Sequence, residues 1–314
     1  MTTTWSNNDQ ASTAEFQPRY PKGYWDDKEE HLQKCFLLHH NEDYLEFLVR
    51  SVWKLDQTCR LAEVGCGFGR MGLALMRLLP EGSAYTGIDQ SAKLITKGRM
   101  VWADMPWQAE FHEGSIYDTP FNSQSFDITL THTVLMHVPY PEKVIHEMMR
   151  VTKPGGLVIT CEVNRNAHTA MLHIEVSNHQ EMAPLELFQT INREIRKRTG
   201  VDHNIGARLP VLMHAAGLKH IQIRVSDASR FLYPPMDTDD KNKLFTAICD
   251  EGYGQARPDD EGRKWWKANL MGFGIAEQKA EAEINRELEE DFLTKGGGYH
   301  TVYTRVLTWC FGVV

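Results

Sequence analysis

An acidic residue followed by three glycines at alternate positions is the feature that most constrains this chain. Residues 61–69 read LAEVGCGFG, so an apolar run leads to Glu63 and then to the three glycines, of which Gly65 is the first. Residues 71–79 (MGLALMRLL) are typical of a helix. A strand that leads through a glycine turn into a helix is the first unit of a nucleotide-binding α/β fold, because glycine lets backbone approach a ligand and a helix N-terminus offers free N–H groups. We therefore expect the functional site at the carboxyl end of this strand.

Strand and helix patterns alternate as far as residue 163. The expected strands are 60–64, 84–88, 109–112, 125–131 and 157–163, and the helices between them are 70–79, 91–103 and 141–151. Before the fifth strand, residues 153–156 (KPGG) predict a turn, because proline ends the helix and glycines permit a reversal. Such alternation requires a parallel sheet that helices cover on both faces.

Composition narrows the class of protein. The 314 residues are 42% hydrophobic and 24% charged, which is typical of a globular protein with one α/β domain and additions, or with two small domains. A net charge of −8 argues against a nucleic-acid or anionic-membrane partner. Six scattered cysteines without a C-x-x-C pair, a polar N-terminus without a secretory signal and the lack of any apolar run near 18 residues predict a cytoplasmic protein that does not enter membranes.

The glycine turn departs from the dinucleotide-binding pattern. G-x-G-x-x-G requires glycine at position 70, where Arg70 stands. The acidic Glu63, two residues before the first glycine, does not favour the binding of a phosphate in this loop. The pattern instead favours a ligand that has a cationic, amino-acid-like end and a ribose but no phosphate. Asp89 ends the second strand, 24 residues after Gly65, where a carboxylate can accept hydrogen bonds from both ribose hydroxyls.

Four motifs in order give a resemblance to a known family. They are EVGCGFG (63–69), GIDQ (87–90), SFDITL (125–130) and KPGG (153–156). With them, residues 60–163 resemble a class I S-adenosylmethionine-dependent methyltransferase. The resemblance implies a Rossmann-like α/β fold with a seven-stranded, mostly parallel sheet and S-adenosylmethionine as the cofactor, and it says almost nothing about the acceptor.

The resemblance also implies residue roles. Gly65 and Gly67 would line the methionine part, and Glu63 would orient the loop or meet the ammonium group through water. Asp89 would bind the ribose hydroxyls, and Ser115 stands where many relatives carry an acid that accepts from the adenine amine. The full implied cofactor-binding set is Glu63, Gly65, Cys66, Gly67, Arg70, Asp89, Gln90, Ser115, Ile116, Thr131 and His132.

Catalytic groups are harder to choose. His132 and His137 flank the loop that is expected to face the sulfonium, and either is a candidate general base, although histidines in such loops often only pack and form hydrogen bonds. Tyr24 is a candidate for cation–π stabilisation of the sulfonium. For metals, His168 and His173 are off the i, i+4 spacing, and Arg150 breaks an H-E-x-x-H match, so we expect no metal.

The flanking segments complete the expected organisation. We expect a disordered tail (1–19), an N-terminal helical arm or lid (20–59), the cofactor-binding core (60–225), a helical insert that forms a lid, acceptor or dimer region (226–298), and a final core strand (299–314). The arm and the insert are expected to cover the site and exclude water.

The predicted function is methyl transfer from S-adenosylmethionine to a small molecule such as an amino acid, a keto acid or a secondary-metabolite intermediate. The first alternative is attack at another sulfonium carbon, for example cyclisation to azetidine-2-carboxylate with release of methylthioadenosine. The second is a non-catalytic binding subunit. The expected partners are a small-molecule acceptor, and optionally a second copy in a homodimer, with no nucleic acid and no membrane.

Overall fold

The computed structural model describes residues 23–174, 185–251, 260–289 and 300–314. Its main sheet has seven strands in the order β3-β2-β1-β4-β5-β10-β7. Strands β3, β2, β1, β4 and β5 are parallel, and β10 pairs antiparallel with both β5 and β7. The predicted seven-stranded, mostly parallel sheet is therefore confirmed. The bounds are β1 Arg60–Val64, β2 Ala84–Asp89, β3 Gln108–Glu113, β4 Phe126–His132, β5 Thr152–Val163, β7 Lys219–Val225 and β10 Leu307–Val313.

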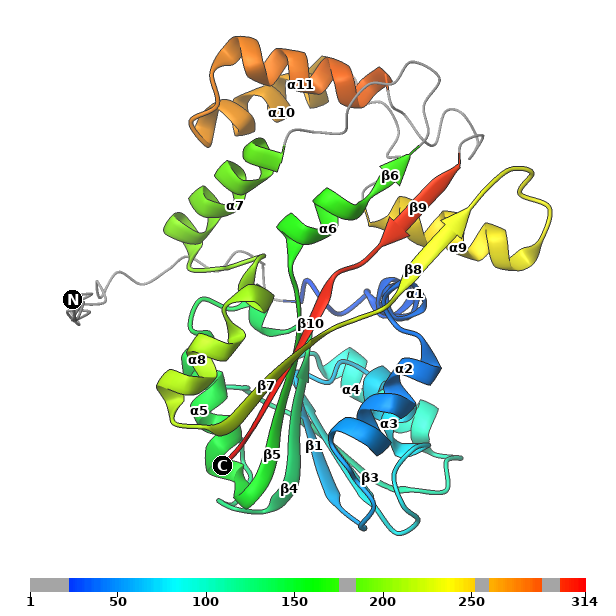
Figure 1. Cartoon of the computed structure of the whole chain (residues 1–314), viewed down its shortest axis with the longest axis vertical. Coiled ribbons are helices and arrows are strands. Elements are labelled where there is room, and N and C mark those ends of the chain that lie inside the picture. The colour runs from blue at the N-terminus through cyan, green and yellow to red at the C-terminus, as the bar shows by residue number, and fades with distance from the viewer. Residues whose placement is uncertain (1–22, 175–184, 252–259, 290–299) are drawn as a thin grey trace.

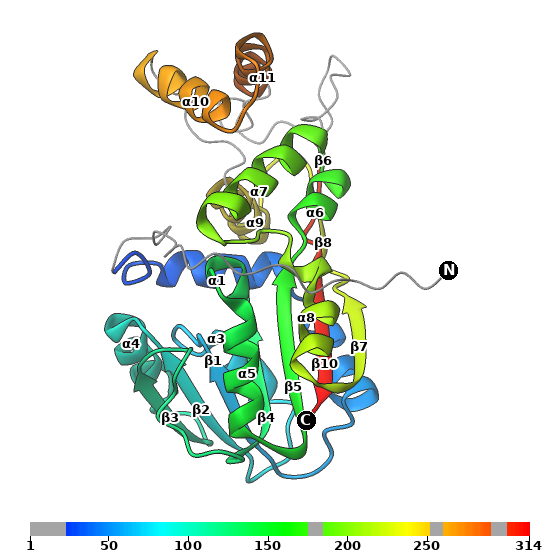
Figure 2. The same cartoon turned by 90° about the vertical axis from the view of Figure 1, so that its left-hand side faces the viewer.

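Helices cover both faces of this sheet (Figure 2). One face carries α3 (Arg70–Met76) and α4 (Ala92–Trp102), with α2 (Glu42–Phe47) and the π-helical turn η1 (Leu48–Val52) beside them. The other face carries α5 (Pro141–Val151) and α8 (Leu209–Ala216), which follows the 3-10 turn η3 (Ile205–Ala207). Ser91 caps α4 as its side chain accepts a hydrogen bond from the backbone N–H of Leu94.

Tyr85 of β2 packs against both α3 and α4. Its ring is buried and stacks on Trp102 with centroids 4.3 Å apart. Its hydroxyl donates a 2.7 Å hydrogen bond to Glu63. A Cβ atom at Gly72 would lie 2.2 Å from the Tyr85 ring, so α3 can approach the sheet this closely only with glycine at this position.

A second, three-stranded sheet extends beyond the carboxyl end of the main one (Figure 1). It consists of β6 (His173–Ile174), β9 (Thr301–Thr304) and β8 (Ser229–Leu232), all antiparallel. The expected single strand over 299–314 is therefore two strands in different sheets, and the insert expected to be helical over 226–298 begins with a strand. The order β6-β9-β8 matches the order β5-β10-β7 in the main sheet. The chain connects β5 to β6, β7 to β8 and β9 to β10, so each strand of the small sheet follows or precedes its partner in the main sheet.

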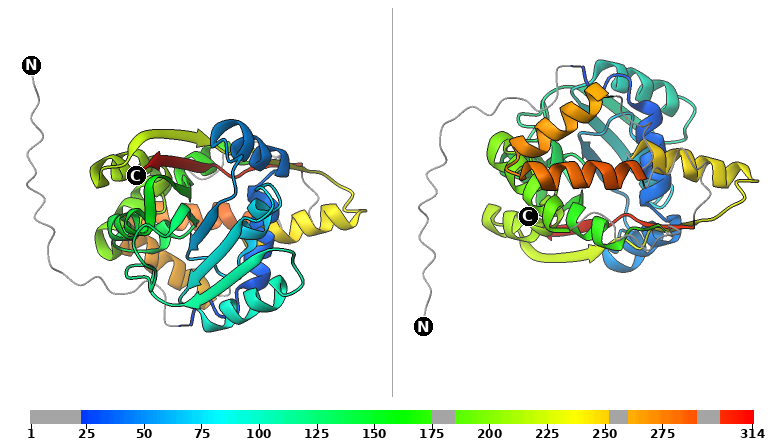
Figure 3. Two further views of the ribbon diagram at one scale, coloured as in Figure 1. Left: turned by 90° about the horizontal axis from the view of Figure 1, so that it is seen from below. Right: turned by 90° about the horizontal axis from the view of Figure 1, so that it is seen from above.

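The remaining helices lie around and beyond the second sheet. They are α1 (Glu29–His39), α6 (Arg165–Met171), α7 (Leu185–Thr199), α9 (Asp239–Asp250), α10 (Asp260–Gly272) and α11 (Glu277–Glu289). Seen from above, α10 and α11 lie over the molecule while α9 crosses α1 (Figure 3). Ala280 of α11 and Ile275, which precedes this helix, pack on Leu187 of α7. This part of α11 is therefore held by an apolar contact within the chain.

One local expectation and one general capping preference differ from the structure. The KPGG segment lies within the bounds of β5 and shifts its register with β4, because Gly155 adopts a left-handed φ of 79°. Asn41 occupies the N-cap position of α2 but its side chain makes no cap; it bonds Asp227 and Arg230 instead. Tertiary partners therefore outweigh the local capping preference.

The expected tail over 1–19 lies outside the described residues. Among the described helices, none has the length and apolar character needed to cross a bilayer.

Gly72→Ala tests the close contact between α3 and Tyr85. We expect a loss of about 1–3 kcal/mol in the free energy of unfolding, because the stacked ring has no room to move away from the added methyl group. Urea denaturation followed by circular dichroism measures it. Gly272→Ala is the control: no atom lies within 4 Å of the new Cβ, so stability should change by less than about 1 kcal/mol.

Candidate active site

A cavity of about 1060 Å³ lies at the carboxyl ends of β1, β2, β3 and β4. The turn after β1, the ends of β2 and β3 and the loop after β4 form its floor and walls. Helix α1 runs across this end of the sheet and contributes Leu32, Cys35 and Phe36 (Figure 2). A space of this size fits a nucleoside cofactor together with a small second molecule.

Most residues of the predicted site meet at this cavity. The predicted residues that line it are Glu63, Gly65, Cys66, Gly67, Arg70, Asp89, Gln90, Ser115, Ile116, His132 and His137. Thr131 and Tyr24 are outside its lining. The Thr131 side chain is buried, and its hydroxyl lies 3.4 Å from Glu162.

Glu63 holds the glycine turn from within the core. Its Oε2 accepts hydrogen bonds from the backbone N–H of Gly72 (3.0 Å) and from the hydroxyl of Tyr85 (2.7 Å). Burial raises the pKa of this carboxyl to about 8, although both bonds oppose the shift. The residue thus ties β1 to α3 and β2.

Asp89 joins the ends of β1 and β2. One carboxylate oxygen accepts from the backbone N–H of Gly67 and the other from that of Ser91, each at 2.9 Å. Burial raises the pKa of Asp89, while these backbone bonds counteract the shift. The carboxylate is fixed in position at the cavity wall before any ligand arrives.

Glu162 is a buried acid that the sequence analysis did not identify. One carboxylate oxygen accepts from the N–H groups of Val134 and Leu135 at 2.9 and 2.7 Å, and the other from Met136 at 3.2 Å. These groups begin the 3-10 turn η2 (Leu135–His137), so Glu162 caps it from strand β5. Burial raises the pKa of Glu162 to about 7. An acid within an otherwise apolar strand was the available sequence signal.

The loop that Glu162 holds also meets the glycine turn. A Cβ at Gly65 would lie 2.5 Å from the Val134 side chain, and Gly65 has a φ of 76°. Glycine is required here both for the backbone conformation and for the close approach of the two loops.

The far wall of the cavity follows β3. Gly114, Ser115 and Ile116 line it, and the Ser115 hydroxyl accepts a 3.2 Å hydrogen bond from the backbone N–H of Tyr117. This hydroxyl therefore stabilises its own turn. Gln90 lines the same region and is exposed.

The N-terminal arm reaches over the site. Asp26 accepts a 2.7 Å hydrogen bond from the Ser91 hydroxyl, next to Asp89. Trp25 lines the cavity and packs edge-on against the His137 ring, with centroids 4.8 Å apart. Tyr24 packs against Trp25 from outside, and the Lys28 ammonium lies over its ring. Of these two aromatic residues, Trp25 lines the cavity and Tyr24 does not.

His132 belongs to a buried aromatic group. Its Nε2 lies 2.7 Å from Nε2 of His40, so one imidazole donates and the other accepts. The indole of Trp309 packs beside both rings. Burial lowers the pKa of His132 to about 3 and that of His40 well below its usual value, so both rings are neutral at physiological pH.

Arg70 stands at the start of α3, at the opposite end of the glycine turn from Asp89. Its guanidinium lies 3.6 Å from the centroid of Phe36 in a cation–π contact, and both residues line the cavity. The cavity lining thus includes the Asp89 carboxylate and the Arg70 guanidinium. Together they suit a ligand that has a diol and a carboxylate group.

Comparison with known proteins agrees with this geometry. Residues 62–160 match a family described as a methyltransferase domain. An uncharacterized methyltransferase of Schizosaccharomyces pombe is 34% identical over 125 residues, which are 38% of this chain and 44% of the relative. The ubiquinone biosynthesis O-methyltransferase of Klebsiella pneumoniae is 28% identical over 37% of this chain and 47% of its own length. The chain therefore spans less than half the length of these curated relatives.

A solved structure shares the fold. Phosphoethanolamine N-methyltransferase 2 of Haemonchus contortus, in complex with S-adenosyl-L-methionine, aligns with a TM-score of 0.50 and 13% identity over 93% of this chain and 58% of that chain. Residues 62–160 are thus similar to known methyltransferase domains, as the motifs in this part of the chain predict.

Glu63→Gln tests the buried carboxyl through the pH dependence of stability. Because the folded-state pKa of about 8 exceeds the usual 4.5, the folded protein binds the proton more tightly than the unfolded chain does. The free energy of unfolding should therefore fall as pH rises from about 4.5 to 8, by about 1.4 kcal/mol for each unit of pKa difference.

In Glu63→Gln this slope should be reduced, since the amide oxygen still accepts the two hydrogen bonds but does not titrate. Part of the slope up to about pH 7 should persist, because Glu162 also has a raised pKa. Urea unfolding at several pH values measures it, and Glu46→Gln on the exposed face of α2 should retain the wild-type slope. Equal slopes in Glu63→Gln and wild type would contradict the assignment.

Proposed function

We propose that this chain binds S-adenosylmethionine in the cavity and transfers its methyl group to a small-molecule acceptor. The observation that carries the proposal is that the Asp89 carboxylate and the Arg70 guanidinium line the same cavity. Asp89 would accept from the ribose hydroxyls, and Arg70 would bind the methionine carboxylate in a bidentate manner. Gly65, Cys66 and Gly67 would lie along the methionine chain, with Gln90, Ser115 and Ile116 beside the adenosine.

The chemistry asks little of the protein beyond alignment. A bound sulfonium is already activated, so catalysis consists of holding the acceptor in line with the transferred carbon, excluding water and accepting any proton that the acceptor loses. Trp25 is placed to give cation–π stabilisation to a sulfonium, in place of Tyr24. Thr131 would act through Glu162, which shapes the loop after β4.

His137 is the proposed general base. It lines the cavity on the turn that Glu162 fixes, whereas Nε2 of His132 is occupied by His40 and its pKa of about 3 makes it a weak base. His132 would instead shape the methionine end of the cavity.

The cover of the site favours a small acceptor. Residues 23–39 and the end of α7 line the cavity opposite the sheet, so a macromolecule has little access to the sulfonium. A net charge of −8 does not favour nucleic acid, and all six cysteines are free thiols, which supports a reducing compartment such as the cytoplasm.

The nucleoside product tests the reaction. The protein is incubated with S-adenosylmethionine and a panel of amino acids, keto acids and phenols, and the products are analysed by mass spectrometry. S-adenosylhomocysteine that depends on an acceptor supports methyl transfer. Release of 5′-methylthioadenosine would contradict it and indicate attack at another sulfonium carbon. Turnover of neither kind with tight cofactor binding would indicate a binding subunit.

Paired variants test the two ends of the cofactor site by calorimetry. Arg70→Gln should weaken binding of S-adenosylmethionine by about 1.5–3 kcal/mol and leave 5′-methylthioadenosine unaffected, because that nucleoside lacks the carboxylate. Asp89→Ala should weaken both ligands by about 1–3 kcal/mol, since both carry the ribose diol.

Asp127→Ala is the control for these two variants. Asp127 accepts hydrogen bonds from the backbone N–H of Arg60 and from the Lys153 ammonium at the amino-terminal end of the strands, away from the cavity. Its removal should therefore change the affinity for neither S-adenosylmethionine nor 5′-methylthioadenosine. Loss of affinity for both ligands in Arg70→Gln would show that Arg70 does not meet the carboxylate.

His137→Gln tests the general base. For an acceptor that must lose a proton, kcat should fall by about 10²–10⁴-fold while the Kd of S-adenosylmethionine is unchanged. Stopped assays and calorimetry measure the two quantities. His146→Gln on the exposed face of α5 should behave as wild type. A normal kcat in His137→Gln would exclude this residue as the base.

A further inference from the structure

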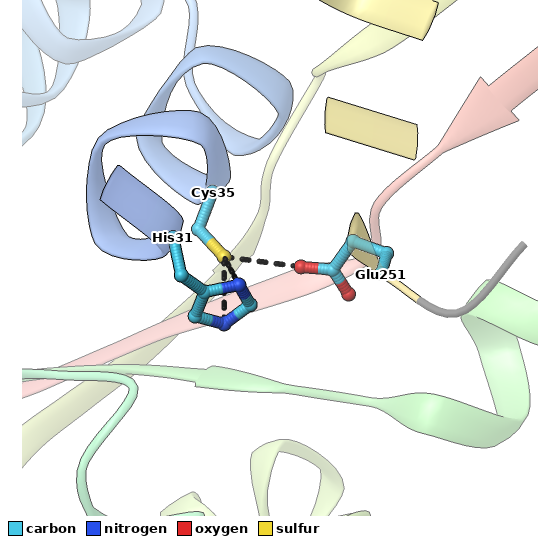
Figure 4. Close-up of side chains that lie close together, drawn as sticks. All are labelled: His31, Cys35 and Glu251. Carbon is cyan, nitrogen blue, oxygen red and sulfur yellow. Dashed lines mark hydrogen bonds between the residues drawn. The ribbon is translucent and has the colours of Figure 1, made fainter. Parts of the chain in front are cut away.

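A cluster of metal-ligand side chains lies where the N-terminal arm meets the insert. The Cys35 sulfur is 3.4 Å from Nε2 of His31 and 3.1 Å from Oε1 of Glu251, and the three ligand atoms lie within 4.8 Å of one another. Figure 4 shows the sulfur between the His31 ring and the carboxylate. His31 and Cys35 are four residues apart on α1 and therefore share one face of that helix, while Glu251 directly follows α9.

His39 lies beside the same cluster, about one turn beyond Cys35 on α1. Its ring is only 2% exposed, and its Nε2 lies 3.4 Å from Oε1 of Glu251. Within the described residues, neither ring nitrogen makes a well-directed hydrogen bond. In either tautomer, at least one of the two buried ring nitrogens of His39 is left without a well-directed hydrogen bond.

We infer that His31, Cys35 and Glu251 form a binding site for one divalent cation of the zinc type. Around an ion with bonds of about 2.0–2.3 Å, tetrahedral donors lie roughly 3.3–3.7 Å apart. The Cys35 sulfur already lies 3.4 Å from Nε2 of His31 and 3.1 Å from Oε1 of Glu251, and all three ligand atoms lie within 4.8 Å of one another, so adjustments of flexible side chains bring them to this spacing.

The ligand types select the ion. A thiolate and an imidazole favour zinc over magnesium or calcium, which prefer oxygen donors. On binding, the Cys35 thiol loses its proton to solvent and the sulfur donates its lone pair to the ion. Without an ion the thiol donates a 3.1 Å hydrogen bond to Oε1 of Glu251.

Arginines orient the ligating carboxylate from outside the cluster. Nη1 of Arg305 lies 2.9 Å from Oε2 of Glu251, and Nη1 of Arg165 lies 4.0 Å from the same atom. Oε1 is thereby left to face Cys35 and His39. Such support of a ligand by a neighbouring charged group is common in metal sites. A thiolate and a carboxylate together neutralise a divalent ion, so the arginine charge does not exclude it.

The site also borders the active-site cavity, because Cys35 contributes to the cavity lining. A bound ion would link α1, which covers the cavity, to the end of α9. It would therefore fix the position of Leu32 and Phe36, which line the same wall. The site does not depend on the proposed methyl transfer.

Metal titration of the full chain tests this inference. After removal of metals with a chelator, Co²⁺ should bind at one ion per chain with a thiolate-to-cobalt charge-transfer absorption, and Zn²⁺ should displace it and raise Tm. Cys35→Ser should abolish the charge-transfer band, and His31→Gln should lower the affinity about 10- to 100-fold. Cys249→Ser is the matched control, since this cysteine on α9 packs with apolar neighbours and should leave the band intact.

Three results would overturn the inference. They are a wild-type chain that takes up no stoichiometric Co²⁺ or Zn²⁺, a Cys35→Ser variant that binds Co²⁺ with the wild-type affinity and spectrum, and a band that is lost equally in Cys249→Ser. Near-ultraviolet circular dichroism of each metal-free variant checks that the fold is retained, so that loss of binding is not mistaken for unfolding.

Discussion

Buried carboxylates that accept hydrogen bonds from backbone N–H groups hold the active-site loops in place. Glu63 binds the start of α3, Asp89 joins the ends of β1 and β2, and Glu162 caps the turn after β4. Parallel strands end at this edge with loops whose polar backbone groups would otherwise be buried without partners. The same burial that makes these acids costly to ionise makes their hydrogen bonds short and directional, so the cavity walls are fixed before a ligand binds.

The cover of the cavity is assembled from distant parts of the chain. Residues 23–39 lie over the glycine turn, and they are held by Ser91 on one side and by Glu251 and Arg230 on the other. Helix α9 packs on α1, and the second sheet supports α9 through Leu232 and Tyr303. Movement of the arm is therefore coupled to the insert, and any opening of the cavity must break polar contacts between the two.

The core was predictable and the polar contacts between distant segments were not. Local apolar patterns and turn residues define β1 to β5, and four motifs in order carry the family resemblance that implies the cofactor. The pairing of His40 with His132 and the cap made by Glu162 depend on segments far apart in the chain, for which no local pattern exists. The second sheet was missed because its strands are two to four residues long. The His31–Cys35 spacing was readable, but its third donor, Glu251, comes from another helix.

The position of β10 has a consequence for the order in which this chain can fold. Strand β10 lies between β5 and β7, yet it is synthesised after both and after the whole insert. During synthesis on the ribosome, β5 and β7 therefore carry unpaired edges until residues 307–313 emerge. Pairings between residues as distant as Val163 and Leu307 close slowly, so the nascent chain passes through a state with a five-stranded sheet and exposed apolar edges, which is the state most open to aggregation and to chaperones.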